Sequence, residues 1–546
     1  MNQLFFGDNL HVLRDHIKDE SVDLIYLDPP FNSKATYNVL FRAPNGHESN
    51  AQITAFEDSW HWGEQAEREF DEILHQSNTQ VAQMMDSLRK FLGENDMMAY
   101  LVMMANRLLE LHRVLKSTGS LYLHCDPTAS HYLKIVLDTV FGASNYRNEI
   151  IWIRSRNPKG SQHKSKRYSP DTDTILFYGK SGEAPLYYDR IKVQLTEEEL
   201  MEKYDRVDSM GRFTDGPILR SPSMGDRPNL VYEYKGYTPG PFGWRVSLDN
   251  LREIDRRGNL GWSDTGKPFR KLRPEDDTGD PIGNCWVDIS SINPQAAERL
   301  GYPTQKPLSI LERILQASSN EGDLVLDPFC GCGTTVHAAE KLKRRWIGID
   351  ITHLAISLIE KRLRDAFPDI QFEVHGTPKD LGGARDLAAR DKYQFQWWAC
   401  SLVNAQPYQG KKKGADSGID GLIFFQDDET GAKKIIVSVK GGDHVTVSMI
   451  RDLKGVIDRE KAEIGLFVTL AEPSKPMLKE AASAGIYHPK LFPNKAVPRI
   501  QILTIEELLN GTKRPEYHNI RADSLTFKEA PRESRKEKKV QKDLFE

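Results

Sequence analysis

The sequence has no long apolar run, few cysteines and no excess of charge of one sign. None of its hydrophobic stretches approaches the ~20 residues that a membrane-spanning helix needs. The first ten residues, MNQLFFGDNL, lack the basic start and the apolar stretch of a signal peptide. Five cysteines are an odd number in a chain of 546 residues, which is typical of a reducing compartment. We therefore expect a cytoplasmic protein that is not held in a membrane.

The sequence also lacks the usual signs of a zinc site and of a uniformly basic nucleic-acid-binding protein. Cys330 and Cys332 form a Cys-x-Cys pair, but no Cys-x-x-Cys pair or histidine with ligand spacing accompanies them, so we expect no metal there. The formal net charge at pH 7 is −4, so any nucleic-acid site must be local. A chain of 546 residues is expected to contain two to four domains.

A short apolar segment near the N-terminus ends in an acidic residue. Residues 22–27 are typical of an interior strand of a parallel sheet, and Asp28 follows at the carboxyl end, where open α/β sheets bind ligands. Pro29 and Pro30 carry no amide hydrogen, so nearby carbonyls remain able to accept from a substrate amine. Phe31 offers a flat face on which a base can stack. The segment predicts a pocket for a planar ring with an exocyclic amine.

A second apolar strand ends in Asp327 and leads into a glycine-containing turn. Gly331 and Gly333 permit a tight turn and a close approach of ligand that a Cβ atom would block. The next predicted strand, 344–350, ends in Asp350, whose carboxylate is placed to bind ribose hydroxyls. This pattern indicates half of a nucleotide-binding site, with backbone amides at the start of a helix.

The glycine turn does not fit a dinucleotide cofactor. The dinucleotide fingerprint requires glycine or alanine at the position of Val336, and the charge of Asp327 would repel a pyrophosphate. An acidic turn suits a cationic cofactor better. S-adenosylmethionine carries a sulfonium, an ammonium and a ribose but no phosphate, and we therefore expect it here.

Together, these segments resemble the amino-methylating DNA methyltransferases of the permuted β class. In that family, an Asp-Pro-Pro-Phe/Tyr motif precedes the target-recognition region and the cofactor motif comes last, as it does here. The resemblance covers about residues 1–375 and depends on four segments: Gly7-Asp8-Asn9, Asp28 to Phe31, Thr304 to Pro307, and Asp327 to Thr335. It implies an α/β fold, namely a Rossmann-like, circularly permuted S-adenosylmethionine-dependent methyltransferase domain.

The resemblance also implies roles for individual residues. Asp28, Pro29, Pro30 and Phe31 would form the catalytic motif that holds the target base. The residues implied in binding S-adenosylmethionine are Asp8, Lys306, Asp327, Phe329, Gly331, Gly333, Thr334 and Asp350. The implied reaction methylates N6 of a flipped adenine in double-stranded DNA. Cytosine N4 is the alternative, although family members that act there more often begin the motif with Ser.

A target-recognition region is expected at about residues 155–290. The alternation of strands and helices is lost there, and glycine and proline turns are frequent. The stretch 151–180 contains seven Lys or Arg and only two acidic residues. Such a stretch is either a loop that follows DNA phosphates or an ordinary solvated loop, and we favour the first. The residues expected to contact DNA are Arg154, Arg156, Lys164, Lys166 and Arg167.

A linker at 376–384 is expected to precede a second domain at 385–512. Two β runs predict a hairpin that brings Asp420 and Lys440 close together on adjacent strands. This domain resembles the restriction-endonuclease-like (PD-(D/E)xK) fold of Mrr-type enzymes, whose strands carry Asp and then Glu/Gln-x-Lys. Ser438 departs from that pattern, and a single Asp makes a weak Mg²⁺ site. The domain either cleaves DNA with Mg²⁺, as in a fused restriction–modification enzyme, or is a nuclease remnant that docks on DNA.

The last segment, 513–546, is charged and has no periodicity, so we expect a disordered tail. It ends in Gln541-Lys542-Asp543-Leu544-Phe545, which resembles the short peptide by which bacterial replication factors bind the sliding clamp. The alternative is an incidental terminus. A protein that acts on DNA would be associated with the nucleoid.

Overall fold

The computed structural model describes most of the chain. The described residues are 1–30, 60–155, 168, 171–193, 195–293, 295–302, 304–408, 418–429, 431–492, 494–521 and 524–533, together with the backbone of two paired antiparallel strands, β3 (Thr36–Arg42) and β4 (Glu48–Glu57). Among these residues, no helix is long and apolar enough to cross a bilayer. All five cysteines are free thiols, and only Cys285 is exposed.

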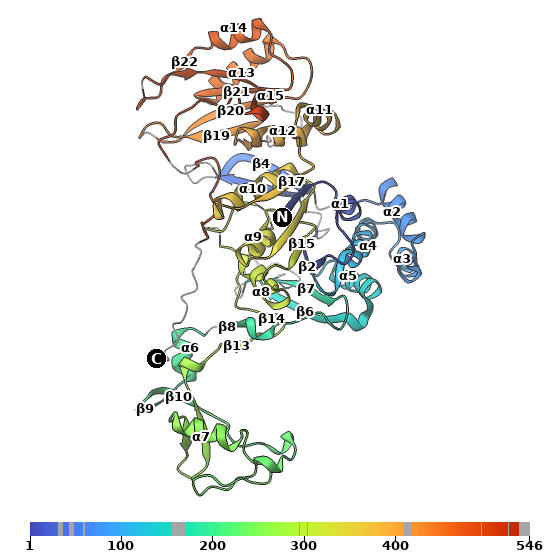
Figure 1. The fold of residues 1–546 in the computed structure, drawn as a ribbon. Helices are drawn as coiled ribbons and strands as arrows, with labels where there is room; N and C mark the ends of the chain where they lie inside the picture. The colour runs from blue at the N-terminus through green and yellow to red at the C-terminus, as the bar shows by residue number, and fades with distance from the viewer. Residues whose placement is uncertain are drawn as a thin grey trace. The chain divides into compact units, whose positions relative to one another are not determined.

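The largest sheet in the described part of the chain has nine strands (Figure 1). In spatial order they are β14 (Cys285–Trp286), β6 (Tyr146–Ile153), β7 (Thr172–Gly179), β5 (Leu115–Cys125), β2 (Val22–Leu27), β15 (Leu324–Asp327), β16 (Arg345–Asp350), β1 (Asn2–Phe6) and β17 (Phe372–His375). All neighbours from β5 to β17 pair in parallel, whereas β7 pairs antiparallel with both β5 and β6. The chain therefore forms the expected α/β sheet, with an antiparallel edge.

The centre of this sheet joins segments that are distant in the sequence. Strand β2 pairs in parallel with β15, with Leu24 opposite Val325 and Ile25 opposite Leu326. These residues are almost fully buried, as expected of short apolar strands inside a parallel sheet. The residues that follow the two strands, Asp28 and Pro328, therefore lie at the same edge of the sheet.

Helices cover both faces of the sheet, with α1, α4 and α5 on one face and α8, α9 and α10 on the other (Figure 1). The helices of this part are α1 (Asn9–His16), α2 (Glu64–Leu74), α3 (Thr79–Leu92), α4 (Asp96–Val114), α5 (Ser130–Leu137), α8 (Leu308–Ser318), α9 (Thr334–Lys341) and α10 (His353–Ala366). Helix α4 is buried over most of its surface, including its methionines, which fill the core beside β2 and β5.

Residues Tyr188–Gly283 form a separate compact unit within the expected recognition region. Its four-stranded sheet has the order β11 (Leu260–Trp262), β12 (Pro268–Leu272), β10 (Gly211–Gly216) and β9 (Arg206–Asp208), accompanied by α6 (Glu197–Lys203) and α7 (Leu248–Arg256). A small apolar core surrounds Trp244, which is fully buried. The turn-rich sequence thus folds around its own core.

The C-terminal domain contains a five-stranded sheet. Its order is β18 (Gln406–Pro407), β19 (Gly421–Phe425), β20 (Lys433–Lys440), β21 (Ile464–Thr469) and β24 (Ile500–Thr504). Its helices are α11 (Leu381–Arg390), α12 (Lys392–Leu402), α13 (Val447–Glu460), α14 (Lys475–Ser483) and α15 (Ile505–Asn510). Strands β19 and β20 form the predicted hairpin, and apolar clusters cover both faces of the sheet.

Two expectations differ from the structure. The predicted linker 376–384 is partly helical, because the side chain of Asp380 accepts a hydrogen bond from the Gly383 amide and caps α11 at Leu381. The predicted tail begins with residues that make specific contacts: Thr526 donates to the Phe424 carbonyl, and the Glu533 carboxylate lies 3.1 Å from Nε2 of His337. Residues 534–546, which include the predicted clamp-binding peptide, lie outside the described residues.

Candidate functional site

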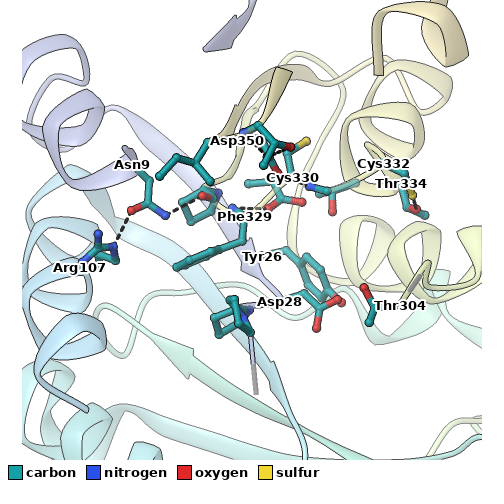
Figure 2. Close-up of a pocket in the computed structure, with 18 of the residues that line it drawn as sticks. Asn9, Tyr26, Asp28, Arg107, Thr304, Phe329, Cys330, Cys332, Thr334 and Asp350 are labelled. Carbon is teal, nitrogen blue, oxygen red and sulfur yellow. Dashed lines mark hydrogen bonds between the residues drawn. The ribbon is translucent and has the colours of Figure 1, made fainter. Parts of the chain in front are cut away.

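A cavity of about 340 Å³ opens at the carboxyl ends of β2, β15, β16 and β1 (Figure 2). Its volume lies in the usual range for small-molecule sites. Ten of the twelve residues expected to act in catalysis or to bind the cofactor line it: Asp8, Asp28, Pro29, Pro30, Lys306, Asp327, Phe329, Gly331, Thr334 and Asp350. The two predicted half-sites therefore share one pocket.

One carboxylate oxygen of Asp28 accepts a hydrogen bond, and the other has no partner among the described residues. Its Oδ2 atom accepts a hydrogen bond from Nζ of Lys306 at 2.5 Å. Its Oδ1 atom is buried and has no hydrogen-bond partner among the described residues. A buried acceptor without a donor is costly, so Oδ1 is suited to accept a hydrogen from a ligand that enters the cavity. Phe31 lies outside the described residues.

The turn that presents Lys306 is strained. Thr304, which also lines the cavity, has a φ of +63°, a conformation that β-branched residues rarely adopt. Such strain costs about 1–3 kcal/mol and is found mainly at functional sites. Lys306, predicted from the sequence to bind the cofactor, lines the cavity, and its ammonium group contacts the Asp28 carboxylate.

The glycine turn between β15 and α9 is held from several sides. The Gly331 amide, where φ is +52°, donates to Oδ2 of Asp350 at 2.9 Å, and a Cβ atom at Gly331 would lie 3.3 Å from Cε1 of Tyr302. Gly333, with φ of +75°, is the N-cap of α9 and does not line the cavity. Buried Arg362 on α10 donates to the Cys332 carbonyl and to the Thr334 hydroxyl, both at 3.1 Å.

Arg107 was not singled out in the sequence, yet it organises one wall of the cavity. Its Nη2 donates to Oδ2 of Asp8 at 3.0 Å, and its Nε donates to Oδ1 of Asn9 at 2.5 Å. Asn9 in turn donates to the Pro328 carbonyl at 2.8 Å, which ties the loop after β1 to the glycine turn (Figure 2). An arginine in the middle of the apolar helix α4 was the available signal, because a buried cation requires partners.

The cavity is acidic. The pKa of Asp327 is raised to about 7, mainly by burial and also by the charges of Asp28 and Asp350, against hydrogen bonds from Thr335 and Phe329 that lower it. Burial also raises the pKa of Asp350 to about 6, against hydrogen bonds from Thr352 and Gly331. A cation in the cavity would stabilise the charged form of each carboxylate. The cavity therefore favours a positively charged ligand.

The cavity fits S-adenosylmethionine in its donors as well as in its charge. The carboxylate of Asp350 is fixed by three protein donors, so that its remaining lone pairs can accept from ribose hydroxyls. Trp60 offers a donor rather than an acceptor. Its Nε1 is buried and has no hydrogen-bond partner among the described residues, and Trp60 lines the cavity. This donor is suited to a carboxylate such as that of the methionine moiety.

Of the residues expected to contact DNA, the structure describes Arg154. It follows β6, and its Nε lies 3.4 Å from Oδ1 of Asp173 on β7. Its side chain remains 38% exposed, so that it can still reach a phosphate. Arg156, Lys164, Lys166 and Arg167 lie outside the described residues.

Asp420 and Lys440 meet in the C-terminal domain, as the hairpin predicts, with Nζ of Lys440 3.8 Å from Oδ2 of Asp420. The Asp420 carboxylate is already engaged by protein donors, because Oδ1 accepts from the Gln396 amide at 3.1 Å and Oδ2 accepts from the Val439 backbone at 2.7 Å. Within the described ranges, no three His, Cys, Asp or Glu side chains are grouped to hold a metal ion. The residues present do not fit a nuclease Mg²⁺ site.

Two family models match the sequence: DNA methylase over residues 22–361 and restriction endonuclease over residues 387–501. Both predicted resemblances are thereby confirmed. A curated relative, the Type II methyltransferase M.EcaI of Enterobacter cloacae, is 34% identical over 269 residues, which are 48% of this chain and 57% of that protein. The Mod subunit of the Type III restriction-modification enzyme StyLTI of Salmonella typhimurium is 25% identical over 356 residues, which are 62% of this chain and 50% of the subunit.

The chain thus spans between half and three-fifths of the length of these two relatives. Among solved structures, the cytosine-N4-specific PvuII DNA methyltransferase is 13% identical, with 68% of this chain and 89% of that chain covered and a TM-score of 0.32.

Proposed function

We propose that this chain, which belongs to the DNA methylase family, transfers a methyl group from S-adenosylmethionine to N6 of a flipped adenine in double-stranded DNA. The observation that carries the proposal is the shared cavity: the unpartnered Oδ1 of Asp28 and the acidic residues Asp327 and Asp350 face the same space. A base and a cationic cofactor bound there would lie next to each other.

Asp28 is proposed to hold and activate the target amine. The lone pair of an adenine amine is conjugated with the ring, which makes it a poor nucleophile. Oδ1 of Asp28 would accept one amine hydrogen and the Pro29 carbonyl the other, which favours a tetrahedral nitrogen. Lys306 fixes the carboxylate through Oδ2, so that little reorganisation is needed as positive charge develops on nitrogen. Phe31 is proposed to stack on the ring.

The cofactor supplies an electrophilic methyl group on a sulfonium sulfur. Asp350 would hold the ribose hydroxyls, while Asp8 and Phe329 would line the adenine end of the cavity. Asp327 would contribute negative charge, and the turn at Gly331 and Thr334 would let the ligand approach the backbone closely. Gly333 would act indirectly, because it shapes the turn without lining the cavity.

The test is to incubate the protein with unmethylated DNA and S-adenosylmethionine, and to identify the modified nucleoside after digestion. We expect N6-methyladenine, and N4-methylcytosine would support the alternative target. Asp28→Ala should abolish methylation while leaving cofactor affinity nearly unchanged. Asp15→Ala, at an exposed position on α1, is the matched control. Strong residual methylation by the Asp28→Ala variant would show that Asp28 is not needed for the reaction.

The basic stretch around Arg154 is proposed to bind DNA phosphates, with Arg156, Lys164, Lys166 and Arg167 as further contacts. Each phosphate contact that is lost should reduce the slope of log affinity against log salt by about 0.9. Alanine variants of these residues should therefore bind duplex DNA with a shallower salt dependence. Arg68→Ala, at a side chain that is 78% exposed elsewhere, should leave the slope unchanged.

The C-terminal domain is proposed to dock on DNA without cutting it. Its Asp420 is held by Gln396 and Val439, and Ser438 stands where the nuclease pattern requires an acid or an amide. The alternative is a fused restriction–modification enzyme that cleaves DNA with Mg²⁺.

The last residues, Gln541 to Phe545, are proposed to bind the bacterial sliding clamp and to keep the protein at the nucleoid. Two apolar anchors on a charged tether suit a peptide that binds in a groove. A double variant, Leu544→Ala with Phe545→Ala, should lose clamp binding in a pull-down assay, whereas Lys538→Ala should retain it. Equal binding by all three proteins would show that the terminus is incidental.

A further inference from the structure

A buried chain of polar side chains leads away from the catalytic carboxylate. Tyr26 points to the same side of β2 as Asp28, because alternate residues of a strand share a face, and both line the cavity (Figure 2). The Tyr26 hydroxyl lies 2.9 Å from Nδ1 of His124 on β5. Nε2 of His124 lies 3.1 Å from Oδ2 of Asp173 on β7. The three residues are 2%, 0% and 3% exposed.

The charge of Asp173 sets the direction of these hydrogen bonds. Burial alone would raise the pKa of Asp173, but its hydrogen bond from His124 and the nearby cations Lys306 and Arg154 outweigh burial and lower it. A charged carboxylate only accepts, so Nε2 of His124 carries the hydrogen and donates it. Nδ1 is then an acceptor, and the Tyr26 hydroxyl donates to it. The hydroxyl oxygen of Tyr26, a residue that lines the cavity, can still accept a hydrogen.

We propose that the Tyr26 hydroxyl takes the proton that the amine loses on methylation, and that His124 and Asp173 are positioning residues that receive and hold this proton. This inference rests on the proposed methyl transfer. The hydrogen bond from the amine and the ion pair with Lys306 leave Asp28 to orient the nitrogen, so that a separate acceptor is useful. Tyr26 is placed for that task beside Asp28.

The step balances in atoms and electrons. As the N–CH₃ bond forms, the S–CH₃ bond breaks and its electron pair remains on sulfur. The amine N–H bond then breaks, and its electron pair returns to nitrogen. Tyr26 gains this proton while its own hydroxyl proton moves to Nδ1 of His124, which leaves an imidazolium ion facing the Asp173 carboxylate. The tyrosine returns to its neutral form within the same step.

Charged groups and one aromatic ring surround the chain. Arg154 on β6 and Lys306 before α8 are the cations that face it, and the ring of Trp152 packs edge-on against the His124 ring at 5.8 Å. Carboxylates act on the chain from several elements: besides Asp173, they are Asp28, Asp126 and Asp327. Asp173, which faces Nε2 at 3.1 Å, is the carboxylate in direct contact with the imidazolium ion that the step forms.

Tyr26→Phe tests the proposal because it removes the hydroxyl and retains the ring. General acid–base groups contribute about 10²–10⁴-fold, so we expect kcat to fall at least tenfold while the affinity for S-adenosylmethionine stays unchanged. The kcat of the wild type should rise with pH and then level off, because the chain can take up a proton only when its acceptor is not already protonated. Tyr26→Phe should lose this dependence on pH.

Two further variants separate the proposal from a structural effect. Tyr122→Phe is the matched control, because Tyr122 is a buried tyrosine on β5 whose hydroxyl contacts Ser318 at 2.6 Å outside the cavity; its kcat and pH profile should remain those of the wild type. Asp173→Asn retains the shape but cannot stabilise an imidazolium ion. Its kcat should fall, and its rise with pH should move to lower pH.

The outcomes are distinguishable. A wild-type protein that methylates no DNA would overturn the proposed function itself. If the wild type is active and Asp28→Ala is inactive, while Tyr26→Phe keeps the kcat and pH profile of the wild type, only the proton-acceptor role fails. Equal losses in Tyr26→Phe and Tyr122→Phe would also overturn it. If Tyr26→Phe does not fold, an unchanged pH profile of Asp173→Asn would overturn the role of the chain.

Discussion

Four carboxylates, those of Asp8, Asp28, Asp327 and Asp350, line one cavity, and their charge favours a cationic ligand. Asp28 is paired with Lys306, whereas Asp327 and Asp350 accept hydrogen bonds from neutral donors. Burial raises the pKa of Asp327 to about 7 and that of Asp350 to about 6, against these hydrogen bonds, which lower it. A cationic ligand changes this balance, because it favours the ionised form of both.

Binding of S-adenosylmethionine should consequently release protons. At about pH 6.5, Asp327 and Asp350 are partly protonated, since their pKa values are about 7 and about 6. The affinity should rise with pH up to about 7 and then level off, because only the charged carboxylates attract the cation. Calorimetry in buffers of different ionisation enthalpy measures the released protons.

S-adenosylhomocysteine lacks the sulfonium charge and is the control ligand, from which we expect a smaller proton release. Identical binding enthalpies for S-adenosylmethionine in all buffers would contradict the linkage.

At the scale of the elements, the turn before α9 and the start of α10 make close contacts with neighbouring elements. Gly333 caps α9 in a left-handed conformation and lies against Ile359 of α10. His353 begins α10, where its backbone amide donates to the Gln394 side chain and its ring stacks on Phe6 with centroids 3.6 Å apart. The contacts of Gly333 and of His353 can each be tested by a substitution.

Gly333→Ala should destabilise the protein more than Gly322→Ala does. Both glycines have positive φ, of +75° and +86°, so both substitutions carry the cost of the left-handed conformation, about 1–2 kcal/mol. Only at Gly333 would the new Cβ meet another atom, Cγ1 of Ile359 at 2.9 Å, whereas Gly322 faces open space. Overpacking should add about 1–3 kcal/mol, measurable by urea denaturation. Equal losses of stability in the two variants would show that the turn accommodates the new Cβ atom at Gly333 without strain.

His353 should make the fold sensitive to acid. Burial lowers its pKa to about 3, with a contribution from the charge of Arg390, so the folded state keeps the ring neutral. The unfolded state takes up a proton at about pH 6.5, and stability is therefore full above that pH and is lost as the pH falls towards 3. His353→Phe preserves the stacking on Phe6 and should weaken this loss in denaturation curves.

His75→Gln, at an exposed side chain, is the control and should follow the wild type. If the stability of His353→Phe falls with pH as steeply as that of the wild type, another group causes the acid sensitivity.

At the scale of the whole molecule, the chain combines a segment that matches the DNA methylase family with a second that matches the restriction endonuclease family. The Tyr188–Gly283 unit is built from its own sheet and core, inserted between β7 and β14 in the sequence. The C-terminal sheet brings Asp420 to Lys440, but protein donors occupy both carboxylate oxygens.

Plasmid DNA incubated with the full chain and Mg²⁺ should therefore remain uncut. A Mg²⁺ site needs several carboxylates or waters around the ion, and Asp420 has neither an acidic partner at Ser438 nor a free oxygen pair. Agarose gels in the presence and absence of S-adenosylmethionine measure the result. Cleavage that disappears in Asp420→Ala would instead establish the fused restriction–modification enzyme.

The local part of this architecture could be predicted from the sequence. The strands that end in Asp28, Asp327 and Asp350, the glycine turn and the β19–β20 hairpin all follow from short-range periodicity and turn chemistry, which neighbouring residues specify. The start of α11 at Leu381 was missed, because the two glycines suggested a linker while the capping side chain of Asp380 favoured a helix.

The tertiary structure alone decided which side chains meet. Tyr26 reaches His124, and through it Asp173, because β2 lies beside β5 and β5 lies beside β7 in the sheet. The contacts of Lys306 with Asp28, and of Arg107 with Asp8 and Asn9, likewise join distant parts of the chain. No periodicity in the sequence encodes these contacts, since they join residues far apart along the chain. The sequence by itself determined the chemical groups at each strand end, and long-range strand pairing determined which of them share a cavity.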